Sequence, residues 1–108
     1  MAGDRIRVLN DTFRADPLRH GRLMVTAGVD AKGPAFVAAA VAAVAAFNTF
    51  TADNDPYGEH DFGAFDLEGE RLYWKIDYYD RDLQFGSPDP ANPAVTTRVL
   101  TIMLRDEY

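Results

Sequence analysis

The sequence contains no cysteine, so neither a disulfide framework nor a thiolate metal site is possible. It also lacks an apolar run of about 20 residues, the length that a helix needs to cross a bilayer. The most apolar stretch is shorter and covers residues 34–47. No apolar segment after the N-terminus is long enough for a signal peptide. We therefore expect a protein of the reducing cytoplasm with no membrane segment.

The motifs of nucleotide-binding proteins and serine hydrolases are missing as well. The glycines of the second half are scattered among acidic residues and form no loop that would cradle phosphates. Ser87 precedes Pro88 without the glycines of a nucleophile elbow. Neither class of enzyme is therefore expected.

The net charge of −6 is concentrated in the middle of the chain. Residues 53–82 hold ten acidic and three basic residues, whereas residues 1–52 carry a net charge of +2. An acidic surface repels the phosphates of nucleic acid and suits cations or a protein partner with a basic surface. Solubility alone is the simpler explanation.

The positive charge near the N-terminus allows two interpretations. It forms either a solvated face or a contact surface for an anion or an acidic partner. In the second case the protein could be a regulator that touches nucleic acid with this end alone. The residues concerned are Arg5, Arg7, Arg14, Arg19 and Arg22.

Hydrophobic periodicity predicts a single α+β domain over residues 1–108, with element order α-β-α-β-β-β. We expect an antiparallel sheet of about four strands, packed against one long alanine-rich helix and a short N-terminal helix. The predicted helices cover residues 4–15 and 34–50, and the predicted strands cover residues 23–29, 62–68, 71–80 and 95–105.

The helix predicted over residues 34–50 has Val37, Val41, Val44 and Phe47 on one stripe, with alanines elsewhere. A face of small residues lets another backbone approach closely. We favour the sheet of the same chain as that neighbour, because a small domain must cover its sheet. A homodimer through this helix is the alternative.

The strand predicted over residues 71–80 alternates between two kinds of side chain. Leu72, Trp74, Ile76 and Tyr78 share one face and are expected in the core. The other face alternates aromatic and charged residues, so it is half-exposed and would line a cleft. It consists of Tyr73, Lys75, Asp77 and Tyr79.

Between the long helix and the next strand lies the chemically richest segment, residues 53–63. Hard oxygen ligands and one imidazole fall within nine residues there: Asp53, Asp55, Glu59, His60 and Asp61. Oxygen-rich sets suit Mg, Ca or Mn, and an added imidazole admits Zn or Fe. The spacing does not match an EF-hand loop. A divalent metal held by Asp55, His60 and Asp61 is therefore an alternative to a turn shaped by its own Asx side chains.

The same segment suggests two further functions. His60, flanked by two acids, would serve as a general base. Aromatic residues beside acids would instead anchor a basic protein partner. The candidate binding residues are Asp53, Asp55, Tyr57, Glu59, His60, Asp61, Tyr73, Asp77 and Tyr79.

Several blocks of residues are similar to a family of short uncharacterised bacterial proteins, a domain of unknown function whose members are often carried on plasmids and other mobile elements. The blocks are Asn10-Asp11-x-Phe13-Arg14, residues 53–63, residues 74–80, and residues 97–108 without positions 105 and 106. The resemblance implies a bacterial, cytoplasmic accessory protein and assigns no residue a role.

These observations favour a small acidic, non-enzymatic binding protein without a cofactor. It would act on a protein partner through the surface of residues 53–82, as an accessory or inhibitory factor of a mobile element. The alternative is a metal-dependent enzyme with its site in residues 53–61.

Overall fold

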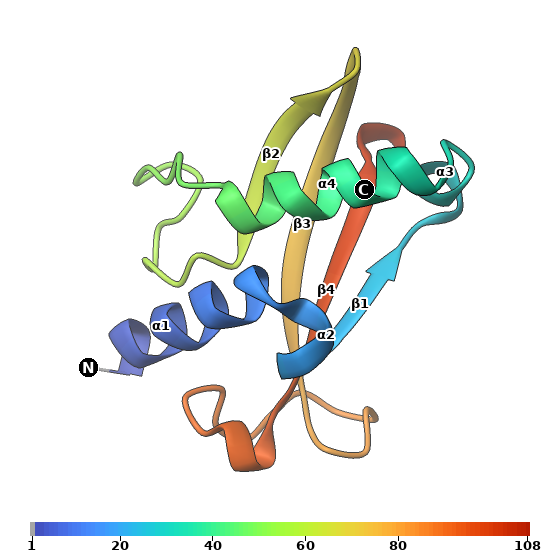
Figure 1. Cartoon of the computed structure of the whole chain (residues 1–108). Coiled ribbons are helices and arrows are strands. Elements are labelled where there is room, and N and C mark those ends of the chain that lie inside the picture. The colour runs from blue at the N-terminus through green and yellow to red at the C-terminus, as the bar shows by residue number, and fades with distance from the viewer. Residues whose placement is uncertain (1) are drawn as a thin grey trace.

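A computed structural model describes residues 2–108 as a sheet of four strands with helices packed on one face (Figure 1). The strand order is β1-β4-β3-β2. Strand β4 pairs in parallel with β1 and antiparallel with β3, and β3 forms an antiparallel hairpin with β2. The strands are β1 (Arg22–Val25), β2 (Phe62–Leu67), β3 (Glu70–Tyr79) and β4 (Thr97–Leu104).

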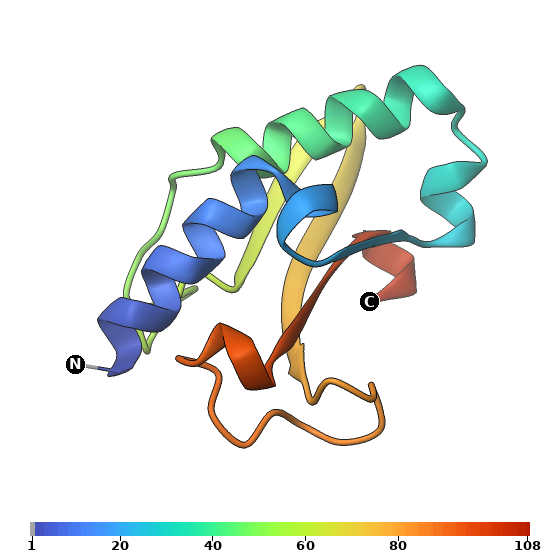
Figure 2. The same ribbon diagram turned by 60° about the horizontal axis from the view of Figure 1, so that its bottom comes forward.

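Two long helices, α1 (Ala2–Ala15) and α4 (Pro34–Ala46), lie on the same face of the sheet (Figures 1 and 2). The loop that joins β3 to β4 projects beyond one end of these strands in both views. The remaining elements are short: α2 (Pro17–His20), α3 (Ala27–Asp30), and the 3-10 turns η1 (Pro93–Val95) and η2 (Arg105–Glu107).

The α+β class is confirmed, but the prediction of an antiparallel sheet is wrong because the sheet is mixed. A helix between two strands returns the chain to the side from which it came, so both strands run in the same direction. Helix α4 does this between β1 and β2. The β2–β3 hairpin and the next reversal then bring β4 in parallel to β1. Side-chain alternation carries no information about these directions.

Several predicted elements are longer than the observed ones, and two of them show the physical cause. The strand predicted over residues 23–29 ends at Val25, and Ala27–Asp30 forms the helix α3. There Glu107 Oε2 accepts a hydrogen bond from the Gly28 backbone N–H at 2.9 Å and holds the chain out of the sheet. The helix predicted over residues 34–50 ends at Ala46. Its last carbonyls are bonded by Arg14 of α1, so no further helical turn is needed to satisfy them.

The core lies between the sheet and the two long helices. The predicted inner face of β3 is confirmed, since Leu72 and Trp74 are fully buried and Ile76 nearly so. Leu100 and Ile102 of β4 extend this layer. The helices contribute Phe13 from α1 and Phe36, Ala40 and Val44 from α4.

The alanines of α4 allow it to lie close to the sheet. Ala40 is fully buried between Phe36 and Val44, whereas the predicted stripe residues Val37 and Val41 are only half-buried. The packing of this helix on its own sheet is thus as expected. No helix within residues 2–108 is long and apolar enough to cross a membrane.

Candidate functional site

The segment that precedes β2 is shaped by its own polar side chains. Asn54 Oδ1 accepts a hydrogen bond from the Thr51 N–H at 2.8 Å, and Asn54 Nδ2 donates to the Thr49 carbonyl at 3.0 Å. These bonds close a turn at the start of the segment, as the Asx interpretation of this sequence predicts.

Asp55 closes the second turn and is nearly buried, with 9% of its surface exposed. Its Oδ1 accepts hydrogen bonds from the backbone N–H groups of Glu59 at 3.0 Å and His60 at 3.2 Å. His60 has a left-handed backbone with φ of 56°, a conformation that few side chains adopt without support. The Asp55 carboxylate therefore serves to hold the backbone of this turn.

The His60 ring is fixed from three sides. Its Nδ1 lies 2.8 Å from Asp11 Oδ1 of α1, and its Nε2 lies 3.7 Å from Asp55 Oδ2. The ring stacks face to face on Phe50, with centroids 3.7 Å apart. The imidazole thus joins the loop to α1.

Arg14 continues this connection to α4. Its guanidinium pairs with Asp11 at 2.9 Å and donates hydrogen bonds to the carbonyls of Val44 at 2.6 Å and Phe47 at 3.0 Å. A cation at the C-terminus of a helix also opposes the helix dipole. The pair Asp11–Arg14 therefore fastens the end of α4 to α1.

Asn10 is fully buried and occupies the centre of a second polar cluster. Its Nδ2 donates to the Glu59 carbonyl at 2.9 Å and to the Tyr78 hydroxyl at 2.8 Å. Its Oδ1 accepts from Arg98 Nε at 2.8 Å, and the Tyr78 hydroxyl donates in turn to Glu59 Oε1 at 3.0 Å. Helix α1, the loop, β3 and β4 are thereby joined through one side chain.

Burial sets the protonation of this cluster. It raises the pKa of the Asp61 carboxyl, and the neighbouring charges of Glu59 and Asp55 raise it further. Burial also raises the pKa of the Tyr78 phenol, which therefore stays protonated as a hydrogen-bond donor. The buried guanidinium of Arg98 has its pKa lowered for the same reason.

The nine predicted binding residues do not form one surface. Asp53 and Tyr57 are exposed on the loop, with Tyr57 83% exposed, while Asp55, Glu59, His60 and Asp61 turn toward α1 and the core. The other three, from β3, lie on the opposite face of the sheet. Asp77 pairs there with Lys75 at 2.8 Å, and Tyr73 packs against Phe62 and Tyr108. The third, Tyr79, is half-buried next to Thr97 of β4.

Sequence reasoning missed the residues that hold the loop in place: Asn10, Asp11, Arg14, Tyr78 and Arg98. All five belong to the blocks that carry the family resemblance, which was the available signal. The spacing of charges could not reveal them, because Asn10 meets partners 49, 68 and 88 positions away in the sequence.

The positions of the three predicted metal ligands can be compared with the geometry of a metal site. No group of three or more His, Asp or Glu side chains that could hold a metal ion is found in residues 2–108. Asp55, His60 and Asp61 are therefore not assembled as a ligand set. None of the three is among the lining residues of four surface pockets of the structure.

Comparison with protein-family models assigns the chain to a family. Residues 25–107 match the model described as protein of unknown function (DUF3768). The chain belongs to this family. No curated protein and no solved structure matches it. The matched residues of this DUF3768 chain include the loop and the strands β2 to β4, whereas α1, with Asn10 and Asp11, precedes them.

Proposed function

We propose that this protein is a non-enzymatic binding protein that engages a protein partner with a basic surface. The observation that supports the proposal is Tyr57, a large aromatic side chain with 83% of its surface exposed on a loop that is held by many hydrogen bonds. A rigid, exposed tyrosine is a common anchor of protein interfaces, since little side-chain entropy is lost when it binds.

The charge around the loop suits a basic partner. Two of the three bases in residues 53–82 are already paired, Arg71 with Asp66 at 3.2 Å and Lys75 with Asp77 at 2.8 Å. The exposed acid Asp53 forms no ion pair within residues 2–108 and lies four positions before Tyr57. Acidic groups at the rim of an interface accelerate encounter with a basic protein.

The most concrete version of this function is an accessory or inhibitory factor of a bacterial mobile element. Its support is the acidic middle of the chain and the resemblance to families carried on such elements. A basic, nucleic-acid-binding protein would then be blocked by an acidic protein that occupies its groove.

A photo-reactive amino acid placed at position 57 in the producing cell tests this proposal. Position 108 is the matched control, because Tyr108 is also an exposed tyrosine, at 74%, but lies on the open face of the sheet. We expect a defined protein adduct at position 57 that is absent at position 108 and weakens at high salt.

Binding to the cross-linked partner, measured with purified proteins, should then fall in Tyr57→Ala and Asp53→Lys but persist in Tyr57→Phe. These positions are exposed, so the variants should keep the melting temperature of the wild type. Equal adducts at both positions, or an affinity for the partner that is unchanged by Asp53→Lys, would refute the proposal.

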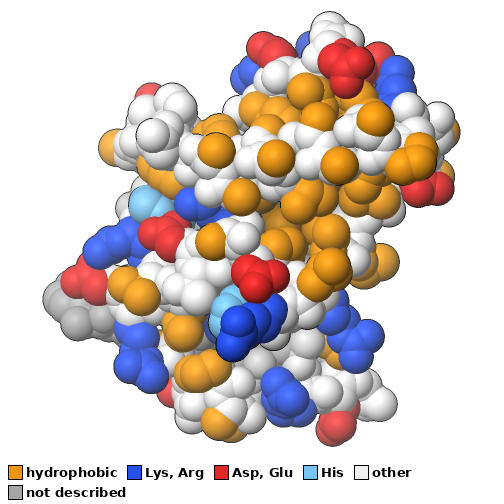
Figure 3. Space-filling model, in the orientation of Figure 1, with side chains coloured by type: hydrophobic (Ala, Val, Ile, Leu, Met, Phe, Trp, Pro, Cys, Tyr) orange, Lys and Arg blue, Asp and Glu red, His pale blue; other side chains and the backbone are white. Residues whose placement is uncertain are grey.

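A homodimer through α4 is the second part of the proposal. The outward alanines of the helix are exposed, and Figure 3 shows separate hydrophobic side chains, and no charged ones, along the middle of α4. Sedimentation velocity across a range of concentrations tests this contact: Ala42→Glu should dissociate the dimer, and Ala15→Glu on the exposed end of α1 is the control. A monomer at every concentration would exclude it.

A further inference from the structure

Two adjoining pockets lie where α1 and α2 meet the loop between β3 and β4. Their cavity volumes are about 130 and 430 Å³, and they share the lining residues His20, Arg81 and Thr96. Arg98 lines the smaller pocket, whereas Arg19 and Arg22 line the larger one. We call these two cavities the arginine pocket. No aspartate or glutamate is among its lining residues, although the chain as a whole carries a net charge of −6.

The four arginines of this pocket have no carboxylate partner among the described residues. Within residues 2–108, five of the eleven lysines and arginines pair with a carboxylate, namely Arg7, Arg14, Lys32, Arg71 and Lys75. Arg19, Arg22, Arg81 and Arg98 form no such pair among the described residues. Positive charge therefore gathers here without its counter-charge.

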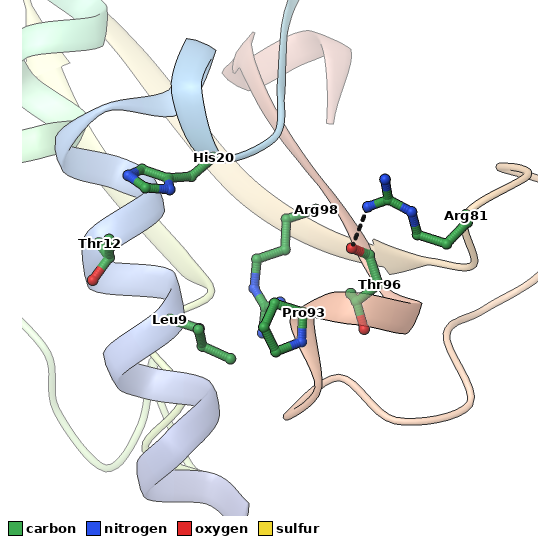
Figure 4. A pocket seen from close by; sticks show the side chains of 7 residues that line it. All are labelled: Leu9, Thr12, His20, Arg81, Pro93, Thr96 and Arg98. Carbon is green, nitrogen blue, oxygen red and sulfur yellow. Dashed lines mark hydrogen bonds between the residues drawn. The ribbon is translucent and has the colours of Figure 1, made fainter.

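Arg98 is the decisive member because it is buried, with only 4% of its surface exposed. It extends from β4 toward Leu9 of α1 and lies beside Pro93 (Figure 4). Its hydrogen bonds go to two neutral acceptors, Asn10 Oδ1 and the Pro90 carbonyl. Burial lowers the pKa of this guanidinium. The guanidinium lies 5.2 Å from the centre of the Tyr78 ring, and the charge of Glu59 raises its pKa from a distance, but no carboxylate of residues 2–108 forms an ion pair with it. Since buried charges are normally paired, an anion in the pocket would supply a direct partner.

The outer wall of the pocket is held in place. Thr96 Oγ1 lies 2.7 Å from Ser87 Oγ and bonds to the Asp89 carbonyl at 2.9 Å. Arg81 donates to the Thr96 carbonyl at 3.4 Å, as the dashed line in Figure 4 marks. Thr12 of α1 and His20 of α2 also line the smaller cavity, on the side of the helices (Figure 4). A ligand would therefore enter a cavity that is already formed, which reduces the entropy cost of binding.

We propose that the arginine pocket binds a phosphate group, either as the free ion or as the terminal phosphate of a small organic molecule. Guanidinium groups match the geometry of phosphate oxygens, and several of them suit a group with nearly two negative charges. A phosphodiester carries one charge per phosphate and needs an open groove. The smaller, more enclosed cavity next to Arg98 fits a terminal phosphate better.

Titration of the full chain at constant ionic strength tests this inference. Inorganic phosphate, adenosine 5′-monophosphate and adenosine would be added in turn, with binding followed by calorimetry and by amide NMR shifts at residues 20–22 and 96–98. We expect phosphate to bind and adenosine not to bind. Equal affinity for phosphate and the monophosphate would identify the free ion as sufficient, and tighter binding of the monophosphate would identify an organic phosphate.

Arg81→Gln and Arg22→Gln should each weaken binding about tenfold, the effect of losing one charge-assisted hydrogen bond. Both residues are exposed, so these variants should fold even if Arg98→Gln does not. Arg105→Gln is the matched control, since Arg105 is exposed and unpaired among the described residues but lines a different pocket. The inference fails if neither phosphate nor the monophosphate binds, if adenosine binds as well as its monophosphate, or if Arg105→Gln weakens binding equally. It also fails if an oligonucleotide without terminal phosphates competes as well as the monophosphate.

Discussion

Replacing Asn10 by alanine should destabilise the protein more than any surface substitution. The variant removes the two bonds that Asn10 donates to Glu59 and Tyr78, and leaves the buried Nε of Arg98 without its acceptor. A net hydrogen bond contributes about 1 kcal/mol, and a buried donor left unpaired costs about 1–3 kcal/mol, or more when it is charged. We therefore expect a loss of at least about 3 kcal/mol, a large part of the roughly 5–15 kcal/mol by which domains are stable.

The loss is measurable by urea unfolding followed through the fluorescence of Trp74, the single tryptophan, which is fully buried in the core. An unfolding entropy of about 2.1 cal/mol/K per residue converts 3 kcal/mol into a fall of about 13 °C in melting temperature. Asn48→Ala is the matched control, because Asn48 is exposed and makes no side-chain hydrogen bond within residues 2–108. It should change stability by less than about 0.5 kcal/mol.

A double-mutant cycle shows whether the loss comes from the cluster. Tyr78→Phe removes the hydroxyl that bonds both Asn10 and Glu59. Combined with Asn10→Ala it should cost less than the two single changes together, by about 1 kcal/mol. Additive effects, or a loss below about 1 kcal/mol for Asn10→Ala, would refute the idea that this side chain joins α1 to the loop.

Further predictions concern single groups. Asp61→Asn should raise the urea midpoint at neutral pH. The raised pKa of the Asp61 carboxyl means that the folded state holds the proton more tightly than the unfolded state, so ionisation of Asp61 lowers stability as pH rises above the ordinary pKa of 3.8. The gain from the substitution should therefore vanish in acid. Glu107→Gln should lower the urea midpoint at neutral pH, because hydrogen bonds from Thr26 and from two backbone N–H groups lower the pKa of Glu107. The stability that the Glu107 carboxylate adds is present above pH 4.5 and is lost as pH falls through the lowered pKa. Gly63→Ala should cost about 1–3 kcal/mol in the same assay, since its methyl group would meet the Trp74 indole. We expect no rise in stability with Mg, Ca, Mn or Zn, because the Asp55 carboxylate is bonded to backbone N–H groups. A metal site would instead raise the free energy of unfolding by about 2.7 kcal/mol at a hundredfold excess of the ion over its dissociation constant. That rise would be lost with EDTA or in Asp55→Ala.

The local parts of the fold could be predicted because they repeat with a fixed period. The buried face of β3 follows from the alternation of Leu72, Trp74 and Ile76, and α4 follows from its alanines. The ends of elements were predicted less well, since distant residues decide them. Arg14 ends α4 and Glu107 ends β1 from elsewhere in the chain. The direction of β1 beside β4 depends on the whole path between them.

The sequence predicts the chemistry of the protein in the loop before β2, but most of the polar atoms of this loop are used within the structure. Asp55 holds two backbone N–H groups, and His60 lies against Asp11 and Phe50. A residue that binds a ligand or transfers a proton needs an atom that the ligand can reach. The sequence cannot show which side chains meet this condition, because it depends on neighbours that lie tens of positions away.

Four arginines line a pocket and, within residues 2–108, none of them pairs with a carboxylate. Arg19 and Arg22 come from the positively charged N-terminal half, whereas Arg81 and Arg98 flank a proline-rich loop, and only the packing of α1 against that loop brings them to one pocket. A contact between Arg5 and the Ala91 carbonyl at 2.6 Å fixes this packing. Repulsion between neighbouring cations lowers the free energy of unfolding, and a bound anion offsets this loss. Stability should therefore rise more with added phosphate than with chloride at the same ionic strength, and Arg81→Gln should reduce this difference.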